Sequence, residues 1–244
     1  MRAAVRRALL LGAAGLALAG AGGALGWSLH TAKLDARLYA QNRLIAVQVH
    51  LDAAPAEYVF LAGDSQAELQ SPSERPCGRE IVNGGVSGAT AAVYADLLRS
   101  LRFPVRPRAA VLTIGTNDLL RKNDPLSADA SARFEKAAGA IVATLKAAAD
   151  EVVVTALPPV GRELDRWLEP AAVGRYSARL KALCERLGCR FADPFEALRD
   201  GDTGFAKPGA MRDGLHLSAY RPVMRALEPA LCPTLPPSRP AAGP

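Results

Sequence analysis

Residues 58–65 read Tyr-Val-Phe-Leu-Ala-Gly-Asp-Ser, an apolar run that ends at a glycine and is followed at once by two polar residues. A short, continuous apolar run bounded by a turn signal is typical of a buried strand in a parallel sheet. In open α/β sheets, ligands bind beyond the carboxyl ends of such strands. This stretch therefore predicts an α/β fold with Asp64 and Ser65 at its functional edge.

The rest of the chain repeats this pattern, with short apolar runs alternating with longer segments of helical periodicity. Further strands are expected at 80–83, 109–114, 151–156 and 189–192, and helices at 90–102, 127–149, 171–187 and 218–230. Ser127 or Asp129 is expected to cap the second of these helices, and Ser218 the last. The alternation predicts a three-layer α/β sandwich in which helices cover both faces of a five-stranded, mostly parallel sheet.

Polar or glycine-rich segments follow several of these strands. They are Gly-Asp-Ser at 63–65, Asn-Gly-Gly-Val-Ser-Gly at 83–88, Gly-Thr-Asn-Asp at 115–118 and, late in the chain, Asp-Gly-Leu-His at 213–216. The segments are far apart in the sequence, but the carboxyl ends of parallel strands share one edge of the sheet. We therefore expect the fold to bring them together.

Together these segments hold the parts that acyl transfer needs, which are a nucleophile, a base, a group that orients the base, and oxyanion donors. Ser65 can attack a carbonyl carbon, and His216 can accept its proton because an imidazole titrates near pH ~6.5. Asp213, in the same turn, can hold the imidazole tautomer. The candidate oxyanion donors are the backbone N–H groups of Ser65 and Gly88 and the side-chain amide of Asn117.

Each segment also has an ordinary structural explanation. Asp64 or Ser65 would serve as a helix cap, Asn117 and Asp118 would form a turn, and a lone histidine such as His216 is usually structural. The glycines would only permit tight bends. The occurrence of all these segments in one order along the chain favours the catalytic interpretation.

Taken in order, the segments resemble the sequence blocks of the SGNH hydrolase superfamily, also called GDSL-like lipases and esterases. Residues 63–65 resemble the block with the serine nucleophile, and 83–88 the block whose glycine, matched here to Gly88, donates an oxyanion N–H. Residues 115–118 resemble the block whose asparagine lines the oxyanion hole, and 213–216 the block with the Asp and His of the triad. The resemblance runs from about Tyr58 to Leu231. It implies a flavodoxin-like fold and a serine esterase that requires neither a metal nor an organic cofactor.

The chain departs from the family pattern near the serine. Gln66 stands where a small or apolar residue is usual, and Glu68 lies close enough to perturb the site. Gly85 is an alternative to the matched glycine of the second block. Ser87, in a sequence close to the G-x-S-x-G nucleophile elbow, is a rival nucleophile. Ser65 is preferred because it follows the stronger strand.

The N-terminus has the pattern of an export signal, with Arg2, Arg6 and Arg7 preceding an uncharged stretch over 8–29. The stretch is long enough to span a bilayer with the arginines on the cytoplasmic side. Small residues over 17–21 also suit a cleavage site, so a removable signal peptide stays an alternative. We expect the protein to be membrane-anchored facing the periplasmic side, or secreted if the segment is cleaved.

The expected organisation has four parts. They are a signal anchor or signal peptide at 1–30, a linker or juxtamembrane helix at 31–55, the hydrolase domain at 56–232 and a disordered proline-rich tail at 233–244.

The charge and the cysteines indicate which partners, metal sites and disulfides to expect. The net charge is +6 and the sequence pI about 9.4, but the basic residues are scattered among acidic ones, so no nucleic-acid partner is expected. The cysteines lack metal-ligand spacing, so no metal site is expected. An even number of cysteines in an exported protein permits two disulfides, with unpaired thiols as the alternative. The pairs would be Cys184 with Cys189, which are close in sequence, and Cys77 with Cys232.

The leading hypothesis is therefore an extracytoplasmic serine esterase that hydrolyses carboxylic esters through an acyl-enzyme on Ser65. The resemblance implies a broad class of ester substrates, and the expected exported location favours a lipid ester or an O-acetylated envelope glycan. One alternative is an O-acyltransferase that passes the acyl group to an envelope glycan. Another is a catalytically silent SGNH-like binding module held in the membrane.

Overall fold

The computed structural model describes residues 35–70 and 73–232. The expected membrane segment over 1–30 and the expected tail over 233–244 lie outside the described residues. Within the described ranges, no helix combines the length and the apolar character that crossing a bilayer requires.

The core of the fold is a five-stranded sheet in the order β2-β1-β3-β4-β5, in which all neighbouring strands are parallel. Its strands are β1 (Tyr58–Gly63), β2 (Glu80–Asn83), β3 (Ala109–Thr113), β4 (Val152–Thr155) and β5 (Arg190–Ala192). The order reverses at β1, as in flavodoxin-like sheets, and ligands bind at such a switch point. The predicted five-stranded α/β fold is confirmed.

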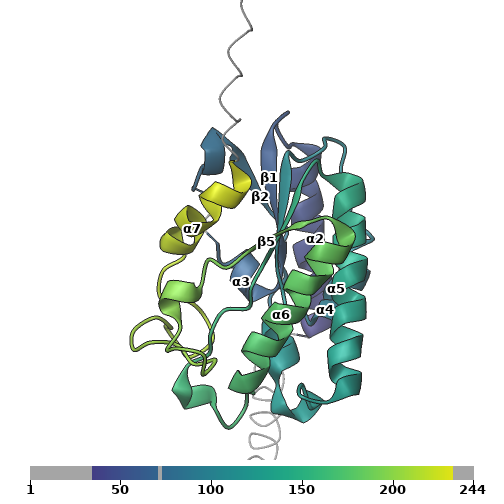
Figure 1. Ribbon diagram of the computed structural model, residues 1–244. Coiled ribbons are helices and arrows are strands. Elements are labelled where there is room, and N and C mark those ends of the chain that lie inside the picture. Colours follow the sequence, from purple (N-terminus) through teal and green to yellow (C-terminus); the bar gives the residue numbers. More distant parts are fainter. Residues whose placement is uncertain (1–34, 71–72, 233–244) are drawn as a thin grey trace, which may run out of the picture. The chain divides into compact units, whose positions relative to one another are not determined.

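Helices cover both faces of this sheet (Figure 1). Helices α4 (Ala91–Leu98), α5 (Ala128–Ala148) and α6 (Pro170–Leu187) lie on one face, and α3 (Ser65–Glu68) and α7 (Arg221–Leu231) on the other. A further helix, α2 (Ala36–Asp52), precedes the sheet. It lies within the range 31–55 that was expected to be a linker or a juxtamembrane helix, and it buries Val47 and Leu51 completely.

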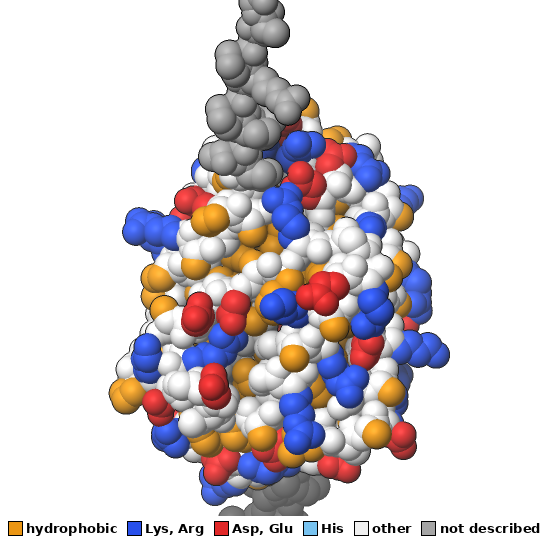
Figure 2. All heavy atoms as spheres, in the orientation of Figure 1, with side chains coloured by type: hydrophobic (Ala, Val, Ile, Leu, Met, Phe, Trp, Pro, Cys, Tyr) orange, Lys and Arg blue, Asp and Glu red, His pale blue; other side chains and the backbone are white. Residues whose placement is uncertain are grey.

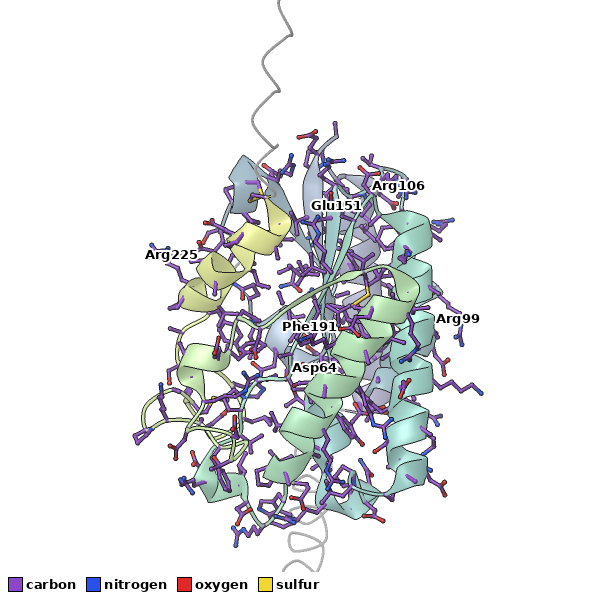
Figure 3. The ribbon with its side chains drawn as sticks, in the orientation of Figure 1. Asp64, Arg99, Arg106, Glu151, Phe191 and Arg225 are labelled. Carbon is purple, nitrogen blue, oxygen red and sulfur yellow. A yellow bond between two sulfur atoms is a disulfide. The ribbon has the colours of Figure 1, made fainter. Side chains whose placement is uncertain are left out.

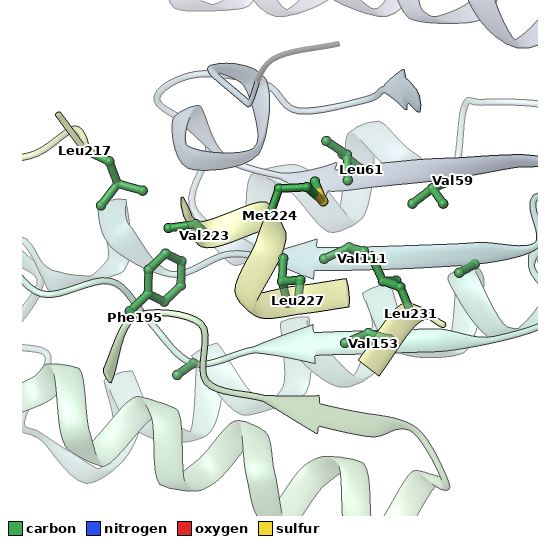
Figure 4. Packing of buried hydrophobic residues seen from close by; sticks show 12 residues of the cluster. Val59, Leu61, Val111, Val153, Phe195, Leu217, Val223, Met224, Leu227 and Leu231 are labelled. Carbon is green, nitrogen blue, oxygen red and sulfur yellow. The ribbon is translucent and has the colours of Figure 1, made fainter. Parts of the chain in front are cut away.

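Helix α7 packs its apolar side against one face of the sheet (Figure 4). The buried face of α7 carries Val223, Met224, Leu227 and Leu231, at the helical spacing that places them on one side. They pack against strand residues that point to the same face, namely Val59, Leu61, Val111 and Val153. Each fully buried aliphatic side chain contributes about 1.5–3 kcal/mol relative to an exposed one. This packing holds the start of α7 close to the end of β1.

Two of the predicted helix caps can be compared with the structure. Ser127 caps α5, because its Oγ accepts a hydrogen bond from the N–H of Ala130 at 3.2 Å. The prediction for Ser218 was wrong, since α7 begins only after Tyr220. The N–H of Ser218 donates instead to the carbonyl of Ala210, so Ser218 belongs to the preceding loop.

Basic and acidic side chains are interspersed on the face of the molecule shown in Figure 2. Arg106 and Arg108 both pair with Asp150, and Arg179 and Arg186 both pair with Glu135. Such exposed pairs contribute little to stability individually. The absence of a nucleic-acid partner stays a prediction.

All of the cysteines are paired. Cys77 is joined to Cys232 across 155 residues, and Cys184 is joined to Cys189 across five. The first bond ties the end of α7 to the turn before β2, and the second closes the end of α6. Both pairs are the ones permitted by the sequence.

Removal of the two disulfides is expected to have unequal effects on stability. In the chain-entropy account, a disulfide stabilises the fold because it restricts the unfolded chain, and the effect grows with the length of the loop that it closes. The upper limit is about 5 kcal/mol for the Cys77–Cys232 bond and about 2 kcal/mol for the Cys184–Cys189 bond. The Cys77→Ser/Cys232→Ser variant should therefore lose more free energy of unfolding in urea than Cys184→Ser/Cys189→Ser. Equal losses in the two variants would contradict this expectation.

Candidate active site

The site is built around the sharp turn at the end of β1. Gly63 has φ +139°, and a Cβ placed on it would lie 1.8 Å from the carbonyl oxygen of Thr113. Only glycine permits the two strands to approach so closely here. The chain leaves β1 through this turn and enters α3 directly at Ser65.

Asp64 occupies the turn and is completely buried, in the interior of the molecule in Figure 3. Its carboxylate accepts hydrogen bonds from the N–H groups of Gln66 (3.0 Å), Gly115 (3.2 Å) and Thr116 (3.0 Å). Burial raises the pKa of Asp64, and the hydrogen bonds lower it. The effect of burial is the larger, so the pKa is about 6. The capping role considered for Asp64 is thus correct, and the same carboxylate also fixes the 115–118 segment beside the turn that carries Ser65.

Ser65, His216 and Asp213 form one hydrogen-bonded chain. The Oγ of Ser65 lies 3.0 Å from Nε2 of His216, and Nδ1 of His216 lies 2.8 Å from Oδ2 of Asp213. The other carboxylate oxygen accepts from the backbone N–H groups of His216 (2.7 Å) and Leu215 (3.0 Å). A proton on Nδ1 leaves Nε2 as an acceptor facing the hydroxyl of Ser65, which is the arrangement that a general base requires.

The environment of Asp213 keeps it ionised. Partial burial acts to raise the pKa of its carboxyl group, but hydrogen bonds from His216 and Leu215 outweigh it and bring the pKa down to about 2. At neutral pH the residue therefore carries the negative charge that favours an imidazolium on His216.

Two backbone donors are free near the serine. Within the part of the chain that the structure describes, no acceptor pairs with the N–H of Ser65 or of Gly88. The N–H of Gly85, by contrast, donates to Oδ1 of Asn83 at 3.0 Å. Gly88 also has φ +78°, a conformation that favours glycine. Of the two candidate glycines, only Gly88 has an N–H left to donate to an oxyanion.

The side chain of Asn117 is placed beside this loop. Its Nδ2 donates to the carbonyl oxygen of Ala89 at 3.0 Å. An amide nitrogen has two hydrogens, so this bond fixes the amide and leaves one donor for a ligand.

The rival serine has a different setting. The N–H of Ser87 donates to the carboxylate of Glu68 at 2.6 Å, and no histidine in the described ranges hydrogen-bonds to the Ser87 hydroxyl.

The role of Gln66 was not predicted from the sequence, in which it appeared only as a departure from the family pattern. Its buried side chain links two parts of the site. Its Nε2 donates to the carbonyl of Leu215 at 2.6 Å, and its Oε1 accepts from the hydroxyl of Tyr220 at 3.1 Å. Gln66 thereby joins the turn that carries Ser65 to the loop that carries His216.

Comparison with known proteins identifies a family that matches most of the chain. Residues 60–220 match the GDSL-like Lipase/Acylhydrolase family, a range that includes all four segments. The chain belongs to this family. It is therefore an enzyme of the class that hydrolyses ester bonds. A search of curated proteins found no match.

Solved structures of low sequence identity share the fold of this GDSL-like hydrolase. A structure from Streptococcus pneumonia, provisionally described as a platelet activating factor, has a TM-score of 0.69 and 19% sequence identity. The match covers 85% of this chain and 99% of the Streptococcus chain. A GDSL-like lipase from Bacteroides thetaiotaomicron has a TM-score of 0.63 and 17% identity, covering 77% and 96%. An acetylxylan esterase from Geobacillus stearothermophilus has a TM-score of 0.55 and 16% identity, covering 73% and 95%.

The GDSL-like hydrolase also contains a second perturbed carboxyl group, that of Asp118. Its Oδ2 accepts a hydrogen bond from the N–H of Ala91, at the start of α4, at 2.9 Å. Burial raises the pKa of Asp118 to about 7, and the nearby carboxylate of Asp64 adds to this effect. Asp118 thus fixes α4 beside the candidate oxyanion donors, but at high pH it carries a charge in a poorly solvated place.

Replacement of Asp118 by asparagine is expected to stabilise the fold in a pH-dependent way. Between pH 3.8, the ordinary pKa, and about 7, the folded chain keeps a proton that the unfolded chain releases, so wild-type stability falls as the pH rises through this window. Asparagine keeps an oxygen for Ala91 and has no charge, so Asp118→Asn should gain about 1–3 kcal/mol over the wild type above pH 7.

Urea unfolding at low and high pH checks this expectation, with the exposed Asp202→Asn as the control. The advantage of Asp118→Asn should disappear near pH 4 and reach a plateau above pH 7. An advantage that does not vary with pH would show that the charge of Asp118 is not its cause.

Proposed function

We propose that this chain is a serine esterase that acts outside the cytoplasm and forms an acyl-enzyme on Ser65. The observation that carries the proposal is the hydrogen-bonded chain from Ser65 through His216 to Asp213, with distances of 3.0 and 2.8 Å. The free N–H groups of Ser65 and Gly88 and the amide of Asn117 support it further. Together they supply every group that acyl transfer requires.

In the first half-reaction, the Oγ of Ser65 attacks the ester carbonyl carbon while its proton passes to Nε2 of His216. The carbonyl oxygen becomes an oxyanion and accepts hydrogen bonds from Ser65, Gly88 and Asn117. Asp213 stabilises the imidazolium that forms and holds the ring in place. The bond to the leaving oxygen then breaks, and the proton on His216 passes to the alcohol that departs.

In the second half-reaction, His216 takes a proton from a water molecule, and the resulting hydroxide attacks the acyl carbon. The same donors stabilise the second oxyanion. The bond to Ser65 breaks, and its Oγ takes back the proton from His216. The products are a carboxylic acid and an alcohol, and the free serine is restored.

We propose a small acyl group on a glycan as the substrate in preference to a long-chain lipid. The apolar cavity between the sheet and α7 is lined by neither Ser65 nor His216, and its volume of about 20 Å³ has room for about one water molecule, so this cavity offers no tunnel for an acyl chain. The side chains of Asp213 and His216 are 52% and 26% exposed, so a bulky alcohol can approach the site from solvent. The fold shared with an acetylxylan esterase also supports this choice.

The proposed location rests on the N-terminal sequence. Residues 1–30 would hold the enzyme in the membrane, or direct it through the membrane if they are removed, and the hydrolase domain would face the periplasmic side. The two disulfides support this proposal, because structural disulfides persist in oxidising compartments.

The test uses the full chain purified in mild detergent, with p-nitrophenyl acetate, p-nitrophenyl palmitate and acetylated xylo-oligosaccharides as substrates. We expect release of free acetate from the first and the last and little hydrolysis of the palmitate. Acetate transferred to an added sugar would favour the acyltransferase. A folded protein that neither hydrolyses an ester nor reacts with a fluorophosphonate would be the silent module, and the proposal would be wrong.

A further inference from the structure

Helix α2 places one arginine against the loop that carries Gly88. The Nε of Arg43 donates to the carbonyl of Gly85 at 2.9 Å, and one terminal nitrogen donates to the carbonyl of Asn83 at 2.8 Å and to its Oδ1 at 3.2 Å. The side chain of Arg43 is only 17% exposed. Its planar guanidinium therefore joins the end of β2, at Asn83, to Gly85 in the loop that follows, as a fork of fixed geometry can.

Glu68 of α3 completes this contact from the opposite side. One of its oxygens lies 3.5 Å from Nε of Arg43, and the other accepts the N–H of Ser87 at 2.6 Å. The side chain of Glu68 is only 18% exposed. The ion pair thus connects α2 to α3, which begins with Ser65, and to the residue just before Gly88.

The loop has little freedom where these contacts hold it. A Cβ on Gly85 would lie 2.2 Å from the backbone nitrogen of Glu68, so the loop packs directly on α3. The Nδ2 of Asn83 lies 2.9, 3.0 and 3.1 Å from the carbonyl oxygens of Ala67, Glu68 and Gln70, which share its two hydrogens, so the end of α3 is fixed to the same loop. The N–H groups at 85 and 87 are thus occupied, and the N–H at 88 is left free.

We propose that Arg43 is a positioning residue for the oxyanion hole, acting through the carbonyls of Asn83 and Gly85 and through Glu68 to fix the N–H of Gly88. Helix α2 is then part of the catalytic unit, although it lies upstream of the family match at 60–220. This inference rests on the proposed esterase function.

The expected effect follows from what an oxyanion donor contributes. Loss of one donor lowers kcat by about 10²–10³-fold, and a displacement of about 1 Å in a catalytic group lowers the rate by as much as about 10²-fold. Arg43→Ala displaces the donor without deleting it, so kcat should fall by about 10–100-fold. KM should change little, because the oxyanion forms only in the transition state.

The experiment compares Arg43→Ala, Arg43→Lys and the control Arg37→Ala in the full chain, with p-nitrophenyl acetate and with urea unfolding. Arg37 lies on the same helix and is exposed. Arg37→Ala should keep the wild-type kcat. Arg43→Lys keeps the charge but not the fork, so its kcat should lie between those of the wild type and Arg43→Ala. If Arg43→Ala does not fold, the kcat of Arg43→Lys relative to that of the wild type tests the proposal instead.

Added guanidinium at low concentration should raise the kcat of folded Arg43→Ala severalfold and leave that of the wild type unchanged, whereas sodium at equal ionic strength should not. A folded Arg43→Ala with wild-type kcat, or a change confined to KM, would overturn the inference. A kcat loss that guanidinium does not restore, in a variant of reduced stability, would assign Arg43 a structural role only. A wild-type chain without esterase activity would instead contradict the proposed function.

Discussion

Replacement of Ser65 by alanine is expected to lower kcat/KM for p-nitrophenyl acetate by about 10⁵-fold or more, with no loss of folding stability beyond about 1 kcal/mol. The Oγ of Ser65 is the atom that faces Nε2 of His216 at 3.0 Å, and without it no acyl-enzyme can form. His216→Ala should lose about as much activity, because residues that act as a unit are not additive. Steady-state hydrolysis by each variant, with circular dichroism to check folding, measures these effects.

The matched control is Ser87→Ala. Ser87 is held through its backbone N–H, which donates to Glu68, and not through its hydroxyl, so removal of the hydroxyl should leave kcat within a few-fold of the wild type. Activity that survives in Ser65→Ala but is lost in Ser87→Ala would move the nucleophile to the second segment. That result would leave the esterase reaction in place and overturn the assignment of the site.

Replacement of Asn117 by alanine is expected to lower kcat by about 10²–10³-fold, with KM nearly unchanged. The side chain donates to the carbonyl of Ala89 at 3.0 Å, so its second hydrogen lies beside the loop that carries Gly88. An oxyanion forms only after attack, and a donor aimed at it stabilises the transition state more than the bound ester.

The control for this variant is Asn123→Ala, because Asn123 is exposed in the short turn that follows. It should retain wild-type kcat. A loss in Asn117→Ala that appears in KM alone would assign the amide to substrate binding. Inactivation by a fluorophosphonate provides a second readout, since it should slow together with kcat.

The sequence was sufficient to predict the sheet and the turn at Asp64 and Ser65 because both depend on local patterns. The apolar run before Gly63 marks a buried strand, and its burial is complete from Tyr58 through Gly63. The interval of three residues between Asp213 and His216 places both in one turn, where they meet at 2.8 Å. In such places short-range spacing alone determines the geometry.

Contacts between distant parts of the chain could not be predicted. Gln66 contacts Leu215 and Tyr220, about 150 residues away, and nothing in the local sequence indicates that pairing. Arg43 lies in a segment predicted to be a linker or a juxtamembrane helix, and its contacts with the 83–88 loop depend on how α2 packs on the domain. Ser218 has a capping side chain near a helix start, but the loop hydrogen bond to Ala210 determines where α7 begins.

The central claim is that Ser65 is the nucleophile of an ester-hydrolysing site, and fluorophosphonate labelling followed by peptide mass analysis tests it most directly. We predict a single phosphonyl adduct on the peptide that contains Ser65, formed in the folded wild type and absent from both Ser65→Ala and His216→Ala. An adduct on Ser87, or a folded protein that hydrolyses p-nitrophenyl acetate at full rate while Ser65 stays unmodified, would contradict the account.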